Sequence, residues 1–145
     1  MRHVILLSAV LLFASISGAQ TRLVIDEVLP PSYIPTGQAM YQQYCASCHG
    51  ANAKGGGPMA PILKTPPSDL TTLSKRRAAM PPYDRKFPYD YVKSILEFGP
   101  GSTSHGSADM PAWGPIFRYL DNQNERAVQQ RIKNLCDYLA SLQEK

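Results

Sequence analysis

Residues 45–49 read Cys-Ala-Ser-Cys-His, and this stretch decides the fold more than any other part of the chain. Two cysteines three positions apart at a helix end project to one side, where both sulfurs can bond the vinyl groups of a single porphyrin. The adjacent histidine then presents its imidazole to the iron from that side. The motif therefore predicts one haem c, bound covalently through Cys45 and Cys48, with His49 as the proximal iron ligand.

Three other uses of these residues compete with haem attachment. A structural disulfide between Cys45 and Cys48 would not need His49. A thioredoxin-like redox pair needs a neighbouring parallel sheet, and the sequence shows no strand pattern of any strength. A zinc site needs four ligands, whereas the chain after residue 19 offers only His105 and Cys136 beyond the motif. Haem attachment is favoured over all three.

The composition describes a small chain with many loops. A length of 145 residues fits one domain. A net charge of +4 suggests neither a tail that coats nucleic acid nor a disordered acidic segment. The chain has no apolar run of the roughly 18 residues that a membrane-spanning helix needs, so an integral membrane protein is not expected.

Outside the motif, the pattern predicts short helices separated by long loops. Glycine and proline assign residues 50–67 and 99–115 to loops. Loops of that length inside a compact domain need something to wrap. The sequence therefore predicts an all-α fold in which three to four short helices and long loops surround one haem. The helices are expected over residues 37–48, from 68 or 69 to about 77, over 89–98, and from about 123 to 143.

The first residues predict an exported protein. Residues 1–19 combine a short basic start, an apolar stretch and an exit of small residues, which is the pattern of a secretory signal peptide. We expect this segment to be cleaved and the protein to reach the periplasm. Residues 20–35 contain three prolines that fix extended backbone, and they predict an N-terminal arm. The haem domain is then expected over residues 36–145.

The second axial ligand of the iron decides the function. Met110 is favoured because it lies in a loop between two predicted helices, with Pro111 to stiffen the backbone and Trp113 to pack beside the ring. Met80 and His105 stay open as alternatives, as does an iron with no protein ligand on that side. A methionine thioether favours Fe(II) and raises the potential, which suits an electron carrier.

These features resemble class I cytochromes c, in particular the small bacterial monohaem carriers, over roughly residues 36–143. The resemblance implies a helical fold around one haem, with an exposed haem edge as the electron port. It also implies that the first and last helices cross closely at Gly37, and that the turn at Pro58 offers a backbone carbonyl to the ring nitrogen of the haem histidine. The matching residues, in order, are Gly37, Tyr41, Gly57-Pro58, Met110-Pro111, Leu135 and Tyr138.

Two features depart from that family pattern. The N-terminal arm is extra, and Cys136 stands where the family has an aliphatic residue. We expect Cys136 to be a small buried hydrophobic residue of the last helix. An intermolecular disulfide is the alternative, because an odd cysteine in an exported chain can pair with another molecule.

Cationic residues gather around the middle of the chain, and three roles for them stay open. They form a solvated surface, pair with haem propionates, or steer the haem edge toward an acidic redox partner. Nucleic acid is not expected as a partner of an exported protein. The residues are Lys54, Lys64, Lys75, Arg76, Arg77, Arg85 and Lys86.

Together these expectations describe an exported monohaem c-type cytochrome, expected to be a monomer. It would carry one electron at a time between redox protein partners while its iron cycles between Fe(II) and Fe(III), and it would have no catalytic residues. One alternative is a haem-bearing subunit of a larger respiratory or dehydrogenase complex, and another is a haem enzyme or gas sensor with an open distal site. Peripheral contact with membrane-bound respiratory complexes is left open.

Overall fold

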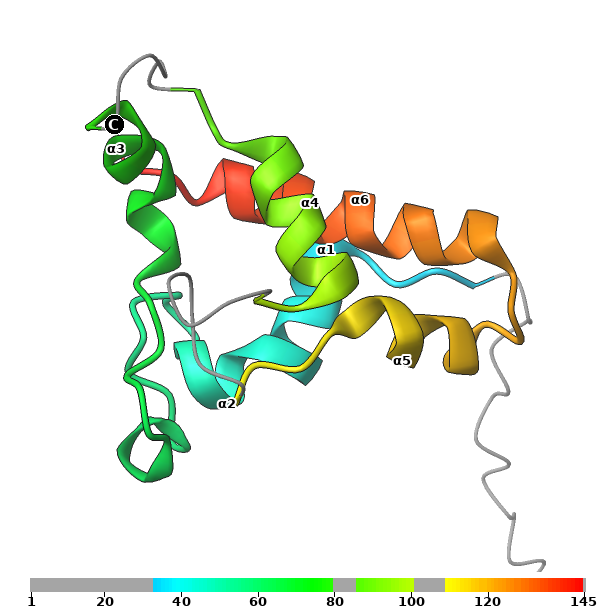
Figure 1. Cartoon of the computed structure of the whole chain (residues 1–145), viewed down its shortest axis with the longest axis horizontal. Helices are drawn as coiled ribbons and strands as arrows, with labels where there is room; N and C mark the ends of the chain where they lie inside the picture. The colour runs from blue at the N-terminus through cyan, green and yellow to red at the C-terminus, as the bar shows by residue number, and fades with distance from the viewer. Residues whose placement is uncertain (1–32, 80–85, 101–108, 145) are drawn as a thin grey trace, which may run out of the picture.

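The computed structural model describes residues 33–79, 86–100 and 109–144, and Figure 1 shows how they are arranged. Within these ranges the chain forms helices and loops, with no strand. The predicted all-α fold class is therefore confirmed. The expected signal peptide and residues 20–32 of the expected arm lie outside the described residues.

The first predicted helix forms, and a wider turn lies within it. α1 (Gly37–Met40), the π-helical turn η1 (Tyr41–Cys45) and α2 (Ala46–His49) follow one another without a break. Thr36 caps the start, because its hydroxyl accepts a hydrogen bond from the Ala39 N–H at 3.2 Å. The helix ends at Gly50, whose φ of 79° is a conformation that glycine adopts without steric cost.

The other predicted helices also form. α4 (Tyr89–Phe98) has the predicted bounds, and α6 (Glu125–Ser141) lies inside the predicted range of 123–143. The helix expected from residue 68 or 69 divides into a short η3 (Leu70–Thr72) and α3 (Leu73–Ala78). A further short turn, η2 (Ala60–Ile62), lies in the long loop after α2.

The helix α5 (Trp113–Leu120) was not predicted, because the sequence analysis assigned residues 99–115 to a loop. Pro115 lies in the first turn of α5, where a backbone N–H has no acceptor inside the helix, so the proline removes no hydrogen bond. Gly114 is required by packing, since a Cβ there would meet the backbone carbonyl of Glu97 in α4. Gly114 and Pro115 are therefore compatible with the start of α5, where this helix lies close to α4.

The crossing of α1 and α6 closes the core. A Cβ at Gly37 would overlap the backbone carbonyl of Asn134 and approach the Cβ of Tyr138 to 2.8 Å, so only glycine allows this approach. One turn further along, the rings of Tyr41 and Tyr138 lie 5.5 Å apart. The close crossing at Gly37 that the family resemblance implies is confirmed.

The helices α4 and α5 pack against α6 and against each other (Figure 1). Cys136 is fully buried in this core, as expected for a small hydrophobic residue, and burial raises the pKa of its thiol to about 12. Across the three described ranges, none of the helices has the length and apolar character needed to cross a bilayer. The buried core consists mainly of Met40, Tyr41, Val92, Leu96, Phe117, Val128, Ile132, Leu135, Cys136 and Leu139.

Candidate functional site

A cavity of about 620 Å³ opens beside the core. Its size is that of a pocket for an organic cofactor, since such pockets measure roughly 300–1,000 Å³. Five parts of the chain line it. They are the first helix with Cys45, Cys48 and His49, a stretch that we call the wall segment (residues 63–77), α4, the loop at 109–113, and Leu135 and Leu139 of α6.

The two motif cysteines share this cavity with His49. Cys45 ends the π-helical turn and Cys48 lies in α2, and both are free and half-buried. Burial, and then the neighbouring Cys48, raises the pKa of Cys45 to about 12, so this group is a neutral thiol. Within the described residues the chain forms no strand, so the parallel sheet that a thioredoxin-like pair needs does not lie beside these cysteines. Among the described residues, no group of three or more His, Cys, Asp or Glu side chains could hold a metal ion.

The imidazole of His49 is fixed by a backbone carbonyl. Its Nδ1 lies 3.0 Å from the carbonyl oxygen of Ser68 in the wall segment. A carbonyl can only accept, so Nδ1 must carry the proton, which leaves the Nε2 lone pair for a metal. Burial lowers the pKa of His49, and the hydrogen bond to Ser68 opposes this in part. The ring is therefore held in the neutral tautomer that a metal ligand needs.

The expectation for the turn at Pro58 is wrong, because the carbonyl that faces His49 belongs to Ser68. Pro58 is exposed and does not line the cavity. The neighbouring Gly57 carbonyl accepts the Ala60 N–H at 2.9 Å, so it is used within its own turn. Ser68 was expected only as a possible first residue of the helix, whose start is instead capped by Asp69 through the Thr71 N–H.

Met110 and Trp113 line the same cavity as His49. Both are partly buried, and both pack against the core. The ring of Trp113 lies 5.2 Å from that of Tyr44, the residue before Cys45, and 5.7 Å from that of Phe117 in α5. This aromatic cluster holds the loop of Met110 near the attachment helix. Tyr44 is a lining residue that the sequence analysis missed.

The other methionines after residue 19, and His105, lie as follows. Met59 is 42% exposed and outside the cavity lining, and Met40 is fully buried in the core, with its sulfur 3.8 Å from Nη1 of Arg131. Met80 and His105 lie outside the described residues. The structure thus brings Met110 together with His49 in one cavity, and the alternatives Met80 and His105 stay open.

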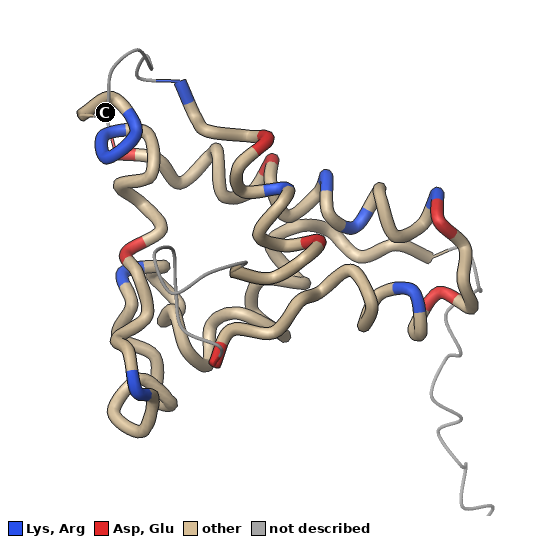
Figure 2. The backbone as a smooth tube through the Cα atoms, viewed as in Figure 1, with Lys and Arg blue, Asp and Glu red and all other residues tan. Residues whose placement is uncertain are grey.

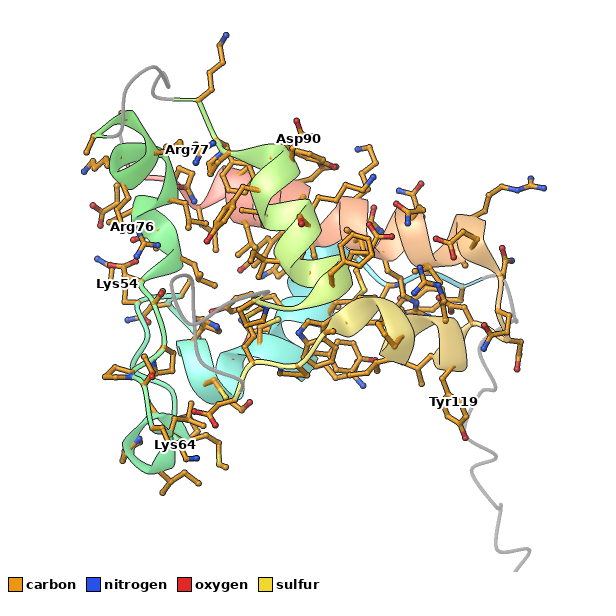
Figure 3. All side chains as sticks on the ribbon, in the orientation of Figure 1. Lys54, Lys64, Arg76, Arg77, Asp90 and Tyr119 are labelled. Carbon is orange, nitrogen blue, oxygen red and sulfur yellow. The ribbon has the colours of Figure 1, made fainter. Side chains whose placement is uncertain are left out.

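The cationic residues of the middle of the chain divide into several kinds. Arg76 and Arg77 of α3 line the cavity, whereas Lys54 and Lys75 pair with Glu144 at 3.2 and 3.1 Å. Figure 2 shows Lys and Arg concentrated on α3, whereas both signs of charge occur along α6. In Figure 3 the labelled Lys54, Lys64, Arg76 and Arg77 lie along one edge of the molecule, far from Tyr119 on α5. Lys86 is exposed, and Arg85 lies outside the described residues.

These residues fit a covalently held haem. One cavity of suitable size is faced by two free thiols and by the His49 imidazole, whose Nδ1 is hydrogen-bonded to the Ser68 carbonyl. The lining of this cavity includes many apolar side chains. Two arginines at the same cavity are suited to bind carboxylates. The residues that line the cavity therefore fit the group that the Cys-Ala-Ser-Cys-His motif predicts.

A comparison with protein families agrees with this fit. The model of the family described as "Cytochrome C oxidase, cbb3-type, subunit III" matches residues 33–98, which include the attachment motif, the wall segment and α4 and end before Met110. No curated protein and no solved structure matches the chain significantly. The family match supports a c-type cytochrome, a class typical of electron transfer, and it implies covalently bound haem c.

Proposed function

We propose that this protein is an exported monohaem c-type cytochrome that carries one electron at a time between redox partners. The observation that carries the proposal is the single cavity shared by Cys45, Cys48, His49 and Met110. In this proposal Cys45 and Cys48 would hold the haem through thioether bonds, and His49 and Met110 would be the ligands of its iron. The haem, when bound, supplies an iron that alternates between Fe(II) and Fe(III).

The protein side chains would keep the site rigid during this exchange. His49 is oriented by the Ser68 carbonyl, which also raises the basicity of the imidazole. The loop of Met110 is held by the packing of Trp113 on Tyr44 and Phe117. Leu96, together with other apolar residues, lines the cavity and offers water no hydrogen-bond partner there. A site that is already in place needs little rearrangement when its charge changes.

In this proposal Arg76 and Arg77 would bind the haem propionates. Both line the cavity from α3, and Arg76 also donates to the Asp69 carbonyl at 2.9 Å, which limits its movement. Guanidinium groups bind carboxylates with charge-assisted hydrogen bonds, so they are suited to haem propionates. Of the three roles considered for the basic cluster, this one is favoured for the two arginines.

The visible spectrum tests the proposal most directly. The protein is matured with haem in a bacterial periplasm, and the oxidised form is examined for the weak far-red band of a methionine sulfur bonded to Fe(III). We expect the band to be present and the reduced protein not to bind carbon monoxide at neutral pH. Covalent haem without the band, together with carbon monoxide binding, would contradict the carrier function and favour an enzyme or gas sensor.

A second function is favoured by the family match, since the matching family is described as a subunit of an oxidase. In that case the chain is a haem-bearing subunit that receives or passes electrons inside a respiratory complex. Fractionation of the source cells distinguishes the two functions. A free carrier is recovered from the periplasm as a monomer without the first 19 residues, whereas a subunit stays with membrane proteins through mild detergent and gel filtration.

A further inference from the structure

We propose that Gln143 and Glu144, which follow α6, are positioning residues that hold the Ser68 carbonyl against Nδ1 of His49 and thereby help to set the iron potential. The inference rests on the proposed function, because it treats His49 as an iron ligand. Neither residue lines the cavity. Both act through the wall segment, to which they are joined by hydrogen bonds and ion pairs.

Gln143 makes the most central of these contacts. Its Nε2 donates to the carbonyl of Leu70 at 2.8 Å, and its Oε1 accepts the N–H of Ser74 at 2.9 Å. The same Nε2 also donates to the carbonyl of Leu139 at 2.8 Å, which connects the amide to α6. One side chain thus links η3, α3 and the end of α6. The nearest of these contacts to Ser68 is at Leu70, two positions further along the chain.

Glu144 contacts the same region through its backbone and its carboxylate. Its N–H donates to the Thr71 carbonyl at 2.9 Å. Its two carboxylate oxygens pair with Lys54, in the loop after the haem motif, and with Lys75 in α3, at 3.2 and 3.1 Å. Those hydrogen bonds to the lysines lower the pKa of Glu144, so the carboxylate is ionised at neutral pH. Glu144 therefore holds the wall segment to the loop that follows His49.

The position of Ser68 depends on this support. Residues 66–69, which include Ser68, are neither helical nor in a turn. The next residues form η3, and η3 is held in place by contacts with other segments. Asp69 caps η3, and the N–H of Leu70 donates to the Ala53 carbonyl at 2.7 Å. With η3 held on one side by Ala53 and on the other by Gln143 and Glu144, the Ser68 carbonyl is kept 3.0 Å from His49.

The expected consequence concerns the donor strength of His49. A hydrogen bond from Nδ1–H to a carbonyl makes the imidazole a stronger donor, and a stronger donor favours Fe(III). If the wall segment moves away, the hydrogen bond lengthens and the potential rises. The Nδ1 proton also exchanges more readily with solvent, because the local opening that exposes it costs less free energy.

The test is Gln143→Leu, which keeps the size of the side chain and removes both hydrogen bonds to the wall segment. Two properties of the haem-loaded protein are measured: the reduction potential, and the exchange of the His49 Nδ1 proton in the diamagnetic reduced state by NMR. We expect a higher potential and exchange about tenfold faster than in the wild type. Glu144→Gln, at an exposed position, should change both properties in the same direction by less.

Gln130→Leu is the matched control, since Gln130 lies on α6 and bonds only Asn134 among its described partners. Val128→Ala, in the core, controls for a general loss of stability. Both controls should keep the wild-type potential and exchange rate. The proposal is overturned if Gln143→Leu and Glu144→Gln leave both properties unchanged, or if Val128→Ala changes them equally. A wild-type protein without covalent haem overturns the proposed function and this inference together, whereas a normal far-red band with unchanged variants overturns only the inference.

Discussion

Arg131 of α6 and Asp121, in the turn after α5, form a buried ion pair with two parallel hydrogen bonds. Nε donates to one carboxylate oxygen at 2.7 Å and Nη2 to the other at 2.8 Å. Their side chains are only 9% and 7% exposed. The guanidinium also lies 5.7 Å from the ring centre of Phe117. The pair fixes the turn between α5 and α6 from inside the core.

We expect Asp121→Ala to lower the free energy of unfolding by about 3–5 kcal/mol, because it leaves the Arg131 charge buried without a partner. Chemical denaturation of the haem-loaded protein measures this change. Arg131→Met with Asp121→Leu, which removes both charges, should restore much of the lost stability. A double variant as unstable as Asp121→Ala would show that packing, and not the unpaired charge, is responsible.

Gly37→Ala should lower the free energy of unfolding by about 1–3 kcal/mol or more. The added Cβ overlaps the backbone carbonyl of Asn134, so α1 and α6 must separate. Gly56→Ala makes the same chemical change where a Cβ meets nothing within 4 Å, and it should be neutral or slightly stabilising. Thermal unfolding of the two variants side by side checks the prediction. Equal midpoints would contradict the close crossing.

Met110→Ala should keep the covalent haem, lower the reduction potential, remove the far-red band and allow the reduced iron to bind carbon monoxide. Mass spectrometry, potentiometry and gas titration measure these outcomes. Met59→Ala is the control, because Met59 is exposed and outside the cavity lining. If Met110→Ala leaves the spectrum and the potential unchanged, Met80 or His105 is the ligand.

Oxidation of the reduced protein by a small anionic reagent should slow as salt is added, because cations lie at the edge of the cavity. Arg76→Gln should slow this reaction about two- to threefold at low ionic strength. Lys133→Gln changes the net charge equally, but it lies on α6, paired with Asp137, and should have a smaller effect. Equal effects of the two variants would mean that only the net charge matters.

Stability should fall at acid pH in part through Asp69. The hydrogen bond from the Thr71 side chain, with the one from its N–H, lowers the pKa of this carboxyl from its usual 3.8. Since the folded pKa is the lower one, this stabilisation is present above pH 3.8 and is lost as the pH falls through the folded pKa. Asp69→Asn keeps a cap at this position and should flatten the decline in urea unfolding measured below pH 4. An unchanged acid decline would exclude Asp69 as its source.

Much of this fold could be predicted from local patterns. The predicted range 89–98 is that of α4, because the glycine and proline after it end the helix, and Cys136, expected as a small buried residue of the last helix, lies in the core. The motif at residues 45–49 correctly led to three side chains facing one cavity. Each of these features depends on residues within one or two turns of each other, so the chain itself specifies them.

The misses depend on contacts between distant segments. The carbonyl that faces His49 comes from a residue 19 positions away, and no local signal distinguishes Ser68 from the turn at Pro58. α5 was missed because Gly114 and Pro115 are loop residues in most settings, whereas here one allows the close contact with Glu97 and the other occupies a first turn. The roles of Gln143 and Glu144 depend on the position of the wall segment, which the sequence does not give.

The wall segment also bears on the order in which contacts form as the chain folds. Lys54 and Glu144 are 90 positions apart, and Leu70 and Gln143 are 73 apart, so these contacts form only after α6 has been made. The attachment helix, in contrast, closes its hydrogen bonds within a few residues. Until those distant contacts form, the wall segment beside the two thiols is not yet joined to the end of α6. This leaves an interval in which a bulky flat cofactor can be joined to the chain before the fold closes around it.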